Sequence, residues 1–327
     1  MQKSIYVFDT RIEIDPLIAF CRETGTDTLI LHPGFFSDEE WIEKPRRNGL
    51  KIWLNFPVLY DEQYLKNNPH AYGITSKGNK AAHSWLHMAC PLNEEYLEIK
   101  RNEFRRAVES VRPDVISYDF IRFYVFWEEV EIAQTPGNIE YGCFCPNCLK
   151  SYSRYVGEND LTVHEINLPE RRKSLGEWKC SIIESIIESF NSMIDVSFKD
   201  IPVYIKTIPW NASDLDGGLA WIAGQKISRL AELSDGLMPM AFPQILGRSF
   251  EWKKKVFDSV EEETGKKVMS IIQFEPLIRQ TEISNETLET DIANAINEKR
   301  KGLLYFHYEQ IMNNGPKRDI LKKFSDA

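Results

Sequence analysis

The sequence predicts a single (β/α)8 barrel that spans residues 1–327. Eight short runs are rich in β-forming residues, helical patterns separate them, and the total length suits one barrel. The runs are mostly continuous in apolar residues and do not alternate with polar ones, which is typical of parallel strands buried on both faces. The predicted strands cover residues 4–9, 28–32, 51–56, 114–119, 203–208, 236–242, 268–274 and 302–307.

Helical periodicity fills most of the segments between these runs. We expect the second helix to begin with a capping box at Ser37. An open doubly wound sheet is the alternative fold, but the first strand is followed by FDTRIEID and not by a glycine-rich phosphate loop. The predicted helices cover residues 15–24, 37–48, 93–111, 219–233, 250–264, 286–301 and 316–324.

Two connections are much longer than the others. Residues 57–92 follow the third strand, and residues 124–201 follow the fourth as an insertion that ends in a long helix at about 169–198. Insertions after barrel strands lie at the C-terminal face, where barrel enzymes build their sites. Both insertions are therefore expected to border the functional site, within one domain.

Composition narrows the class of protein. The 327 residues carry a net charge of −9, and Lys and Arg do not gather into basic blocks, so we expect no nucleic-acid surface. No apolar run has the length of a signal peptide or of a membrane span. We expect no membrane partner and a cytoplasmic chain as written, or a periplasmic or secreted one if a signal was trimmed. Nothing indicates an oligomeric state.

The fourth predicted strand ends in an acid, Asp119, and Arg122 follows it closely. An ionised group that closes a buried strand costs free energy unless it is paired or used. One interpretation is structural: Asp119 caps the strand and forms a salt bridge with Arg122. The other is functional, because the C-terminal end of a barrel strand is where catalytic side chains stand.

Polar side chains recur at the C-terminal ends of the other strands as well. A purely structural barrel does not require so many ionisable groups at one rim. The residues at these ends are Asp9, His32, Asn55, Asp119, Arg122, Lys206, Trp210, Met240, Gln244, Gln273, Glu275, His307 and Glu309.

Asp119 and Glu275 form the predicted catalytic pair. Both end apolar strands in phase with inward-facing positions, and strands four and seven lie across the barrel mouth from each other. Two carboxylates that face each other over a cleft suit glycoside hydrolysis, with one as general acid and the other as nucleophile or base. Glu309 is the main rival of Glu275, and Glu128 and Glu129 are further rivals in a loop whose path the sequence does not define.

We expect the remaining polar and aromatic residues of the rim to contact a carbohydrate substrate. Trp85 and Trp53 are further candidates for stacking on sugar rings, although a place in the core suits each tryptophan equally well. Catalysis of this kind requires no cofactor. The predicted substrate contacts are Tyr118, Arg122, Lys206, Trp210, His307, Glu309, Asn55 and Trp127.

Two other functions remain open. A sugar-binding barrel without catalysis would keep the cleft and lack a working carboxylate pair. A Schiff-base lyase would use Lys206, since a lysine on a middle barrel strand can act as a nucleophile when its pKa is depressed. Lys206 is out of phase for this role if Val203 points inward.

The cysteines suggest a metal site. Cys143, Cys145 and Cys148 form a C-x-C-x-x-C segment, and close thiols suit a soft metal such as zinc. A fourth ligand is needed, and Cys90 or His87 in the preceding long connection could supply it. The alternative is a set of reduced thiols packed in the loop.

Residues 89–152 resemble a family at the level of motifs. An MACP segment, a long helix, the segment PDVISYDFIRF and the segment CFCPNCLKSY follow one another in this order. The order resembles that of glycoside-hydrolase-like TIM barrels from bacterial polysaccharide-utilising organisms. The resemblance implies a (β/α)8 barrel that acts on carbohydrate, with Asp119 as the strand-four carboxylate. The chain departs from the pattern in having Pro113-Asp114 where Asp-Gly is usual, and in lacking an acid at the end of strand six.

Overall fold

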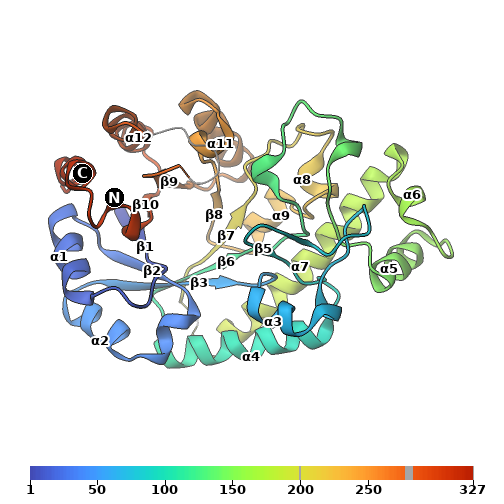
Figure 1. The fold of residues 1–327 in the computed structure, drawn as a ribbon, viewed down its shortest axis with the longest axis horizontal. Coiled ribbons are helices and arrows are strands. Elements are labelled where there is room, and N and C mark those ends of the chain that lie inside the picture. Colours follow the sequence, from blue (N-terminus) through green and yellow to red (C-terminus); the bar gives the residue numbers. More distant parts are fainter. Residues whose placement is uncertain (199, 277–282, 327) are drawn as a thin grey trace.

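The computed structural model describes residues 1–198, 200–276 and 283–326. Its eight parallel strands form one sheet in the order β8-β7-β6-β3-β2-β1-β10-β9, which curls into a nearly closed barrel (Figure 1). Each strand overlaps one of the predicted runs, so the predicted barrel is confirmed. The strands are β1 (Gln2–Tyr6), β2 (Thr28–Leu31), β3 (Lys51–Pro57), β6 (Val115–Asp119), β7 (Val203–Thr207), β8 (Gly236–Pro239), β9 (Met269–Gln273) and β10 (Gly302–Phe306).

Helices cover the outside of the barrel. At least one helix lies between each pair of consecutive barrel strands, as the alternating pattern predicts, and others follow the last strand. The helices of eight or more residues are α1 (Ile14–Thr24), α2 (Glu40–Arg47), α4 (Glu94–Val111), α5 (Pro146–Val156), α7 (Arg172–Ser197), α11 (Phe250–Thr264), α12 (Asn285–Asn297) and α14 (Gly315–Lys323). The shorter ones are α3 (Glu62–Asn67), α6 (Val163–Ile166), α8 (Gly218–Trp221), α9 (Ile227–Glu232), α10 (Pro243–Leu246) and α13 (Tyr308–Ile311).

Two predicted helices differ from those observed. The helix expected over 219–233 is split into α8 and α9, because Gly224 between them has a φ of 71° that ends a helix and is costly for other residues. The helix expected from Ser37 begins at Glu40. Ser37 ends a short 3₁₀ helix (Pro33–Ser37), and Asp38 accepts the hydrogen bond from the Glu40 N–H at 2.9 Å, so no capping box forms at Ser37.

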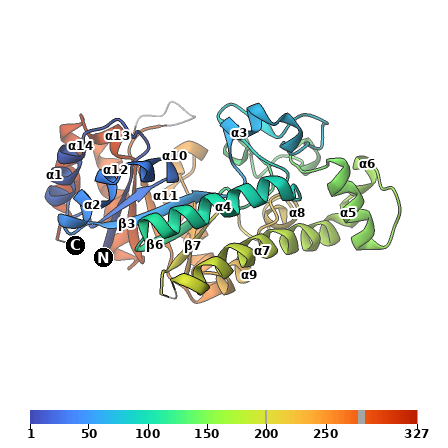
Figure 2. The ribbon, with the colours of Figure 1, turned by 90° about the horizontal axis from the view of Figure 1, so that it is seen from below.

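The two insertions lie beside each other at one end of the molecule. The first carries α3 and the two-stranded hairpin of β4 (Ala82–His83) and β5 (Leu86–His87). The second carries α5 and α6 and leads into α7, which packs against α4 (Figure 2). In the part of the chain that the structure describes, no helix combines the length and apolarity that a membrane crossing requires.

The register of the central strands determines which side chains point into the barrel. Asn55 of β3 pairs with Ser117 of β6, and the Ser117 hydroxyl donates to the Asn55 Oδ1 atom at 2.9 Å. Lys206 of β7 reaches Asp119 on the same inner side. The phase that would point Val203 inward is therefore off by one residue, and Lys206 faces the barrel interior.

A buried ion pair connects two outer helices to the sheet. Lys253 of α11 donates to both carboxylate oxygens of Asp291 in α12, at 2.8 and 3.0 Å, and to the carbonyl of Ile271 in β9 at 2.6 Å. Both side chains are almost fully buried. Removal of one partner from such a pair leaves an uncompensated charge in the interior.

We therefore expect Lys253→Ala to lower the free energy of unfolding by about 3–5 kcal/mol, measured by urea denaturation. The double variant Lys253→Met with Asp291→Leu should recover most of this loss, because it removes both charges. Lys255→Ala is the matched control on the same helix, since Lys255 pairs with Glu251 in solvent, and it should change stability little. An equal loss in Lys253→Ala and Lys255→Ala would contradict the assignment.

Candidate active site

A cavity of about 560 Å³ opens at the C-terminal end of the barrel. It brings together five of the predicted site residues: Asn55, Asp119, Arg122, Trp127 and Lys206. Most of its other walls are aromatic or apolar. The remaining lining residues are Tyr6, Phe8, His32, Pro33, Pro57, Tyr60, Trp85, Phe120, Glu128, Met240, Phe242, Ile245, Ile271 and Phe306.

Asp119 lies at the floor of this cavity and is held by three donors. Lys206 Nζ lies 2.5 Å from its Oδ2 atom, and Asn55 Nδ2 lies 3.2 Å from the same oxygen. The N–H group of Phe120 donates to Oδ1 at 2.9 Å. These donors fix the orientation of the carboxylate. The ion-pair partner of Asp119 is thus Lys206, and not Arg122 as the structural interpretation of the sequence supposed.

The backbone directly after Asp119 is strained. Phe120 has a φ of 51°, in the left-handed region that residues other than glycine rarely adopt. This conformation costs about 1 kcal/mol or more. It turns the Phe120 N–H toward the carboxylate and places the ring in the cavity wall. Strain of this kind is often found at functional sites.

Lys206 is a buried cation that serves Asp119. Burial alone would lower the pKa of its amino group, but the negative charge of Asp119 more than offsets this effect and raises the pKa. The Nζ atom also lies 4.7 Å from the centre of the Tyr6 ring. A lysine whose pKa is raised stays protonated, which disfavours a role as a Schiff-base nucleophile.

Glu128 is the second carboxyl group of the cavity. It stands on a short 3₁₀ helix (Trp127–Glu129), and its side chain is 6% exposed. Burial raises its pKa to about 7, although the charge of Arg122 opposes the shift. The Oε2 atom has no hydrogen-bond partner among the described residues. A buried carboxyl group that is protonated near neutral pH and has a free oxygen can donate a proton to a ligand.

Arg122 is the cation whose charge acts on Glu128. Its guanidinium is buried and donates from Nη1 to the carbonyls of Phe123 and Val125, at 3.2 and 2.8 Å. Burial lowers its pKa, while the nearby charges of Glu128 and Asp119 oppose this effect. Its Nε atom has no partner among the described residues. Arg122 thus stabilises the conformation of the loop after β6, and it adds positive charge near the two carboxyl groups.

Glu275, the predicted partner of Asp119, is engaged elsewhere. Its Oε1 atom accepts from Lys317 of α14 at 2.6 Å, and its N–H donates to Gln310. Lys317 also donates to the carbonyl of Phe274, so the chain after β9 is bound to the outer helix layer. Glu275 does not line the cavity. The pairing of Asp119 with Glu275 remains a prediction that these contacts do not favour.

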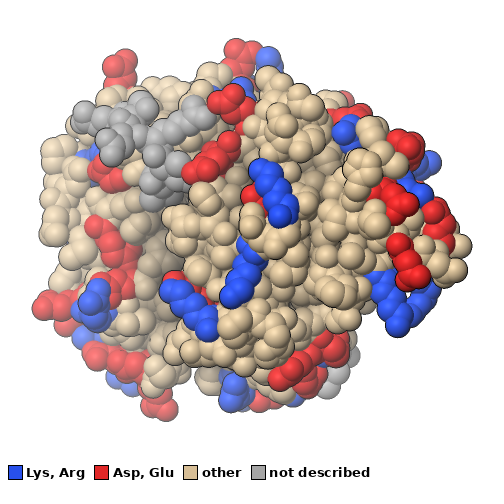
Figure 3. All heavy atoms as spheres, turned by 45° about the vertical axis from the view of Figure 1, so that its right-hand side comes forward, with Lys and Arg blue, Asp and Glu red and all other residues tan. Residues whose placement is uncertain are grey.

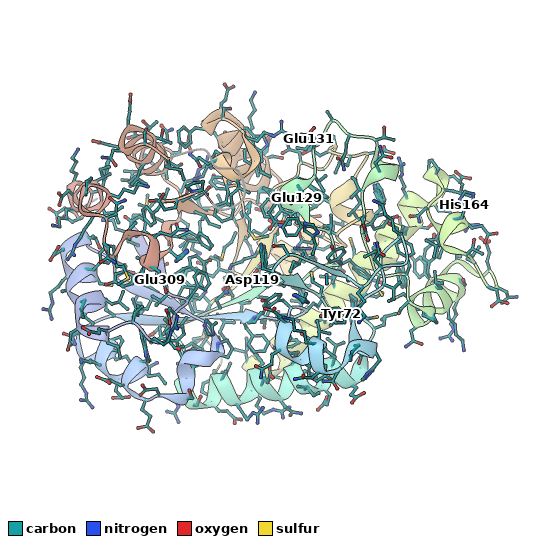
Figure 4. All side chains as sticks on the ribbon, viewed as in Figure 1. Tyr72, Asp119, Glu129, Glu131, His164 and Glu309 are labelled. Atoms are coloured by element: carbon teal, nitrogen blue, oxygen red, sulfur yellow. The ribbon has the colours of Figure 1, made fainter. Side chains whose placement is uncertain are left out.

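Glu309 has a structural position at the edge of the site. Its Oε1 atom accepts from the N–H groups of Phe8 and Asp9, both at 2.7 Å, and its Oε2 atom lies 2.7 Å from His307 Nδ1. Burial would raise the pKa of Glu309, but the His307 hydrogen bond and the backbone donors lower it. Glu309 and His307 thereby fix the loop after β1. Figure 4 shows Glu309 on this side of the barrel, away from Asp119 near the centre.

Two predicted substrate contacts point away from the cavity. Tyr118 lies on the outer face of β6, where it is fully buried and its hydroxyl donates to Asn191 of α7 at 2.9 Å. Trp210 is buried beside a separate hollow next to Val130 and Arg248. A ligand in the cavity would not contact either side chain. Trp53 is fully buried against Tyr204 and belongs to the core.

The sequence pointed to Trp85 as a candidate for stacking, but it missed Phe8 and the other aromatic residues that shape the mouth of the cavity. Phe8 is 40% exposed and Trp85 is 42% exposed, and both line the cavity. Phe8 comes two residues after the end of β1, and it continues the alternation that points Ser4 and Tyr6 inward. This alternation could have identified it. Tyr60 and Phe242 lie beyond their strands, and periodicity does not place them.

The four predicted thiols meet in the insertions. The sulfur atoms of Cys90, Cys143, Cys145 and Cys148 all lie within 4.8 Å of one another, and Cys90 Sγ is 3.5 Å from Cys145 and 3.6 Å from Cys148. All four are free thiols. His87, the other candidate, instead lies 2.6 Å from the Tyr72 hydroxyl. The group could hold a metal ion, and the separations match the edge of a ZnS₄ tetrahedron, about 3.8 Å for Zn–S bonds of about 2.3 Å.

Comparison with known proteins gives a result for structure only. No family model matches the sequence, and no curated protein matches it. Solved structures do match. The glycoside hydrolase domain of PgaB (BpsB) from Bordetella bronchiseptica superimposes with a TM-score of 0.73 at 14% identity, covering 98% of this chain and 99% of that one.

Two longer enzymes show the same likeness. A β-galactosidase from Halorubrum lacusprofundi gives a TM-score of 0.73 at 11% identity over 99% of this chain and 57% of that one. An α-L-fucosidase from Paenibacillus thiaminolyticus gives 0.64 at 11% identity over 99% and 49%. The chain thus spans about half the length of these two enzymes. The likeness establishes the fold: a TIM barrel of the kind found in glycoside hydrolases.

The raised pKa of Glu128 predicts how stability depends on pH. Because the folded pKa of about 7 exceeds the ordinary value of 4.5, protonation of Glu128 stabilises the fold below about pH 4.5, and this contribution is lost as the pH rises through 7. Glu128→Gln removes the penalty. Its stability relative to wild type should rise by about 2–3 kcal/mol between pH 4.5 and 8.5 in urea unfolding. Glu129→Gln, at the half-exposed neighbouring position, should show little such change.

Proposed function

We propose that this protein is a glycoside hydrolase that acts on an oligo- or polysaccharide, with Asp119 and Glu128 as its carboxylate pair. One observation carries the proposal: two carboxyl groups of opposite character share one aromatic-lined cavity at the C-terminal rim of the barrel. Asp119 is paired with a buried cation, whereas Glu128 is buried without a hydrogen-bond partner on Oε2 among the described residues. The structural likeness to glycoside hydrolases agrees with this proposal.

The two environments assign the two roles. Glu128, with a pKa of about 7, is the general acid: its proton passes to the glycosidic oxygen as the bond between that oxygen and the anomeric carbon breaks. Asp119, which is paired with Lys206, either attacks the anomeric carbon or removes a proton from the attacking water. Asn55 and Lys206 are positioning residues, because they act through the Asp119 carboxylate.

Kinetics of matched variants test these roles. The wild type should first be screened on aryl glycosides, including the β-D-galactoside and the α-L-fucoside, and on polysaccharides. On a substrate that it cleaves, Asp119→Asn should lower kcat at least about 1,000-fold. Glu128→Gln should lose about 10²–10⁴-fold on a glycan but much less on a nitrophenyl glycoside, whose leaving group needs little protonation. The alkaline limb of kcat/KM near pH 7 should disappear in Glu128→Gln.

Two further variants decide between the alternative pairs. Glu129→Gln and Glu275→Gln should both retain activity, because neither side chain lines the cavity. A loss in Glu275→Gln comparable to that in Asp119→Asn would reinstate Glu275 as the second carboxylate. Full activity of Asp119→Asn would reject Asp119 as one of the two carboxylates. Sugar binding by a wild-type protein that cleaves no glycan would support a binding barrel.

We also propose that the four clustered cysteines hold a structural zinc ion. Three of them are buried, and the sulfur separations suit tetrahedral thiolate coordination. The ion would join the first insertion, through Cys90, to the second, through Cys143, Cys145 and Cys148. It would take no part in the hydrolysis, since none of these residues lines the cavity.

Elemental analysis of the purified protein should find one zinc per chain. Cys145→Ser with Cys148→Ser should abolish the bound zinc and lower the Tm, because metal binding contributes directly to the stability of the folded state. Cys180→Ser is the control, since this buried thiol lies outside the cluster, and its zinc content should equal that of the wild type. Thiols of the cluster that react freely in the folded protein, with zinc absent from protein grown in its presence, would contradict the proposal.

A further inference from the structure

Two aromatic clusters line the cavity, and the first is built on β1 and β10. The Phe8 ring stacks on Tyr6 at 5.8 Å and meets Phe306 edge-on at 5.6 Å, while Phe306 contacts Phe242 at 5.3 Å. Tyr6 and Phe242 are buried, Phe306 is partly buried, and Phe8 is half-exposed above them. The Glu309 carboxylate fixes the backbone of Phe8. This ring is therefore a rigid apolar platform that faces the cavity.

The second cluster is built on the first insertion and the loop after β6. Tyr60 stacks on Phe120 with 4.7 Å between ring centres, and Trp85 lies 6.0 Å from Phe120 and 5.8 Å from Phe126. Trp85 is the half-exposed ring of this cluster. It stands in the turn of the β4–β5 hairpin. The second cluster thus also has one half-exposed ring that packs against other aromatic rings.

The strand order places the two clusters on opposite sides of the barrel mouth. Going round the sheet from β6, the strands β3, β2 and β1 follow, and β10 lies one step beyond β1. In a barrel of eight, β10 is therefore four steps from β6, and β1, which leads into Phe8, is three steps from it. Trp85 is held on the β6 side by its contacts with Phe120 and Phe126. Figure 4 shows the same arrangement: Asp119 lies between Glu309, on the β1–β10 side, and Tyr72, on the first insertion. The two platforms flank the Asp119–Lys206 pair.

We propose that the cavity binds an interior stretch of a glycan chain, with sugar residues stacked on Phe8 on one side of Asp119 and on Trp85 on the other. A site for a single terminal sugar needs one platform beside the carboxylates, whereas two platforms on opposite sides suit a chain that crosses the mouth. The inference rests on the proposed function for the cleavage itself. It predicts cleavage within chains, with short oligosaccharides as products.

Binding can be measured apart from catalysis in the Asp119→Asn variant. Isothermal titration would use β-1,4-linked galacto- and cello-oligosaccharides of one to six residues. For at least one series, affinity should rise with chain length. Trp85→Ala and Phe8→Ala, each added to Asp119→Asn, should weaken binding of the hexasaccharide about 5–10-fold and of the monosaccharide less than about 2-fold. Because the platforms are separate, the two losses should multiply in the combined variant.

Tyr155→Ala is the matched control, since Tyr155 is 49% exposed on α5 and lies outside the cavity, and it should leave every affinity unchanged. Affinity that is independent of chain length in both series, or an equal loss for monosaccharide and hexasaccharide, would overturn the inference. Release of monosaccharide alone from a cleaved polysaccharide would overturn it and leave the hydrolase intact. Length-dependent binding with both ring effects, in a protein that cleaves no glycan, would support the platforms and reject the hydrolase.

Discussion

The ion pair between Asp119 and Lys206 is the interaction on which the site depends. Two charges at the floor of an apolar barrel are tolerated because each compensates the other, and because Asn55 and the Phe120 N–H complete the hydrogen bonding of the carboxylate. The pair is formed across the β6–β7 ladder, so the sheet register itself sets its geometry. The second carboxyl group, Glu128, has no cation in direct contact among the described residues, and burial raises its pKa to about 7. The two carboxyl groups of the cavity thus have different environments: Asp119 is paired with a cation, and Glu128 is not.

The electrostatics of the site are local. Lys and Arg side chains stand singly or in small groups on the face shown in Figure 3. The electrostatic environment of the two carboxyl groups is therefore set by the charges inside the cavity. There, Arg122 and Lys206 stand behind the carboxyl groups, while aromatic rings form the walls. A low-polarity wall strengthens each charge interaction beside it and binds the apolar faces of sugars. The cavity can therefore combine weak, extended contacts with one strongly polar centre.

The sequence predicted the barrel because continuous apolar runs and intervening helical patterns are local signals that survive in the fold. It also placed Asp119, Asn55 and Lys206 at the correct rim, because a strand end is a property of position along the chain. The partner of Asp119 was harder to predict. In the sequence, Glu275 is in phase with the inward-facing positions of its strand. In the structure, Lys317 from the last helix binds it, and only the tertiary structure reveals that contact. Glu128 lies in a long insertion whose path follows from packing and not from periodicity. The clustering of the cysteines could be predicted because C-x-C-x-x-C is a local motif. Cys90 was one of two candidates for the fourth ligand.

The cysteine cluster has a topological meaning. Cys90 precedes α4 and β6, the other three thiols follow them, and 58 positions separate Cys90 from Cys148. A metal bound by all four would close a loop around the strand that carries Asp119 and the turn that carries Glu128. Such a closure restricts the unfolded chain over this whole segment, as a disulfide would, but it is reversible with metal supply and thiol oxidation. The availability of zinc would then govern how readily the strand that carries Asp119 reaches its place during folding.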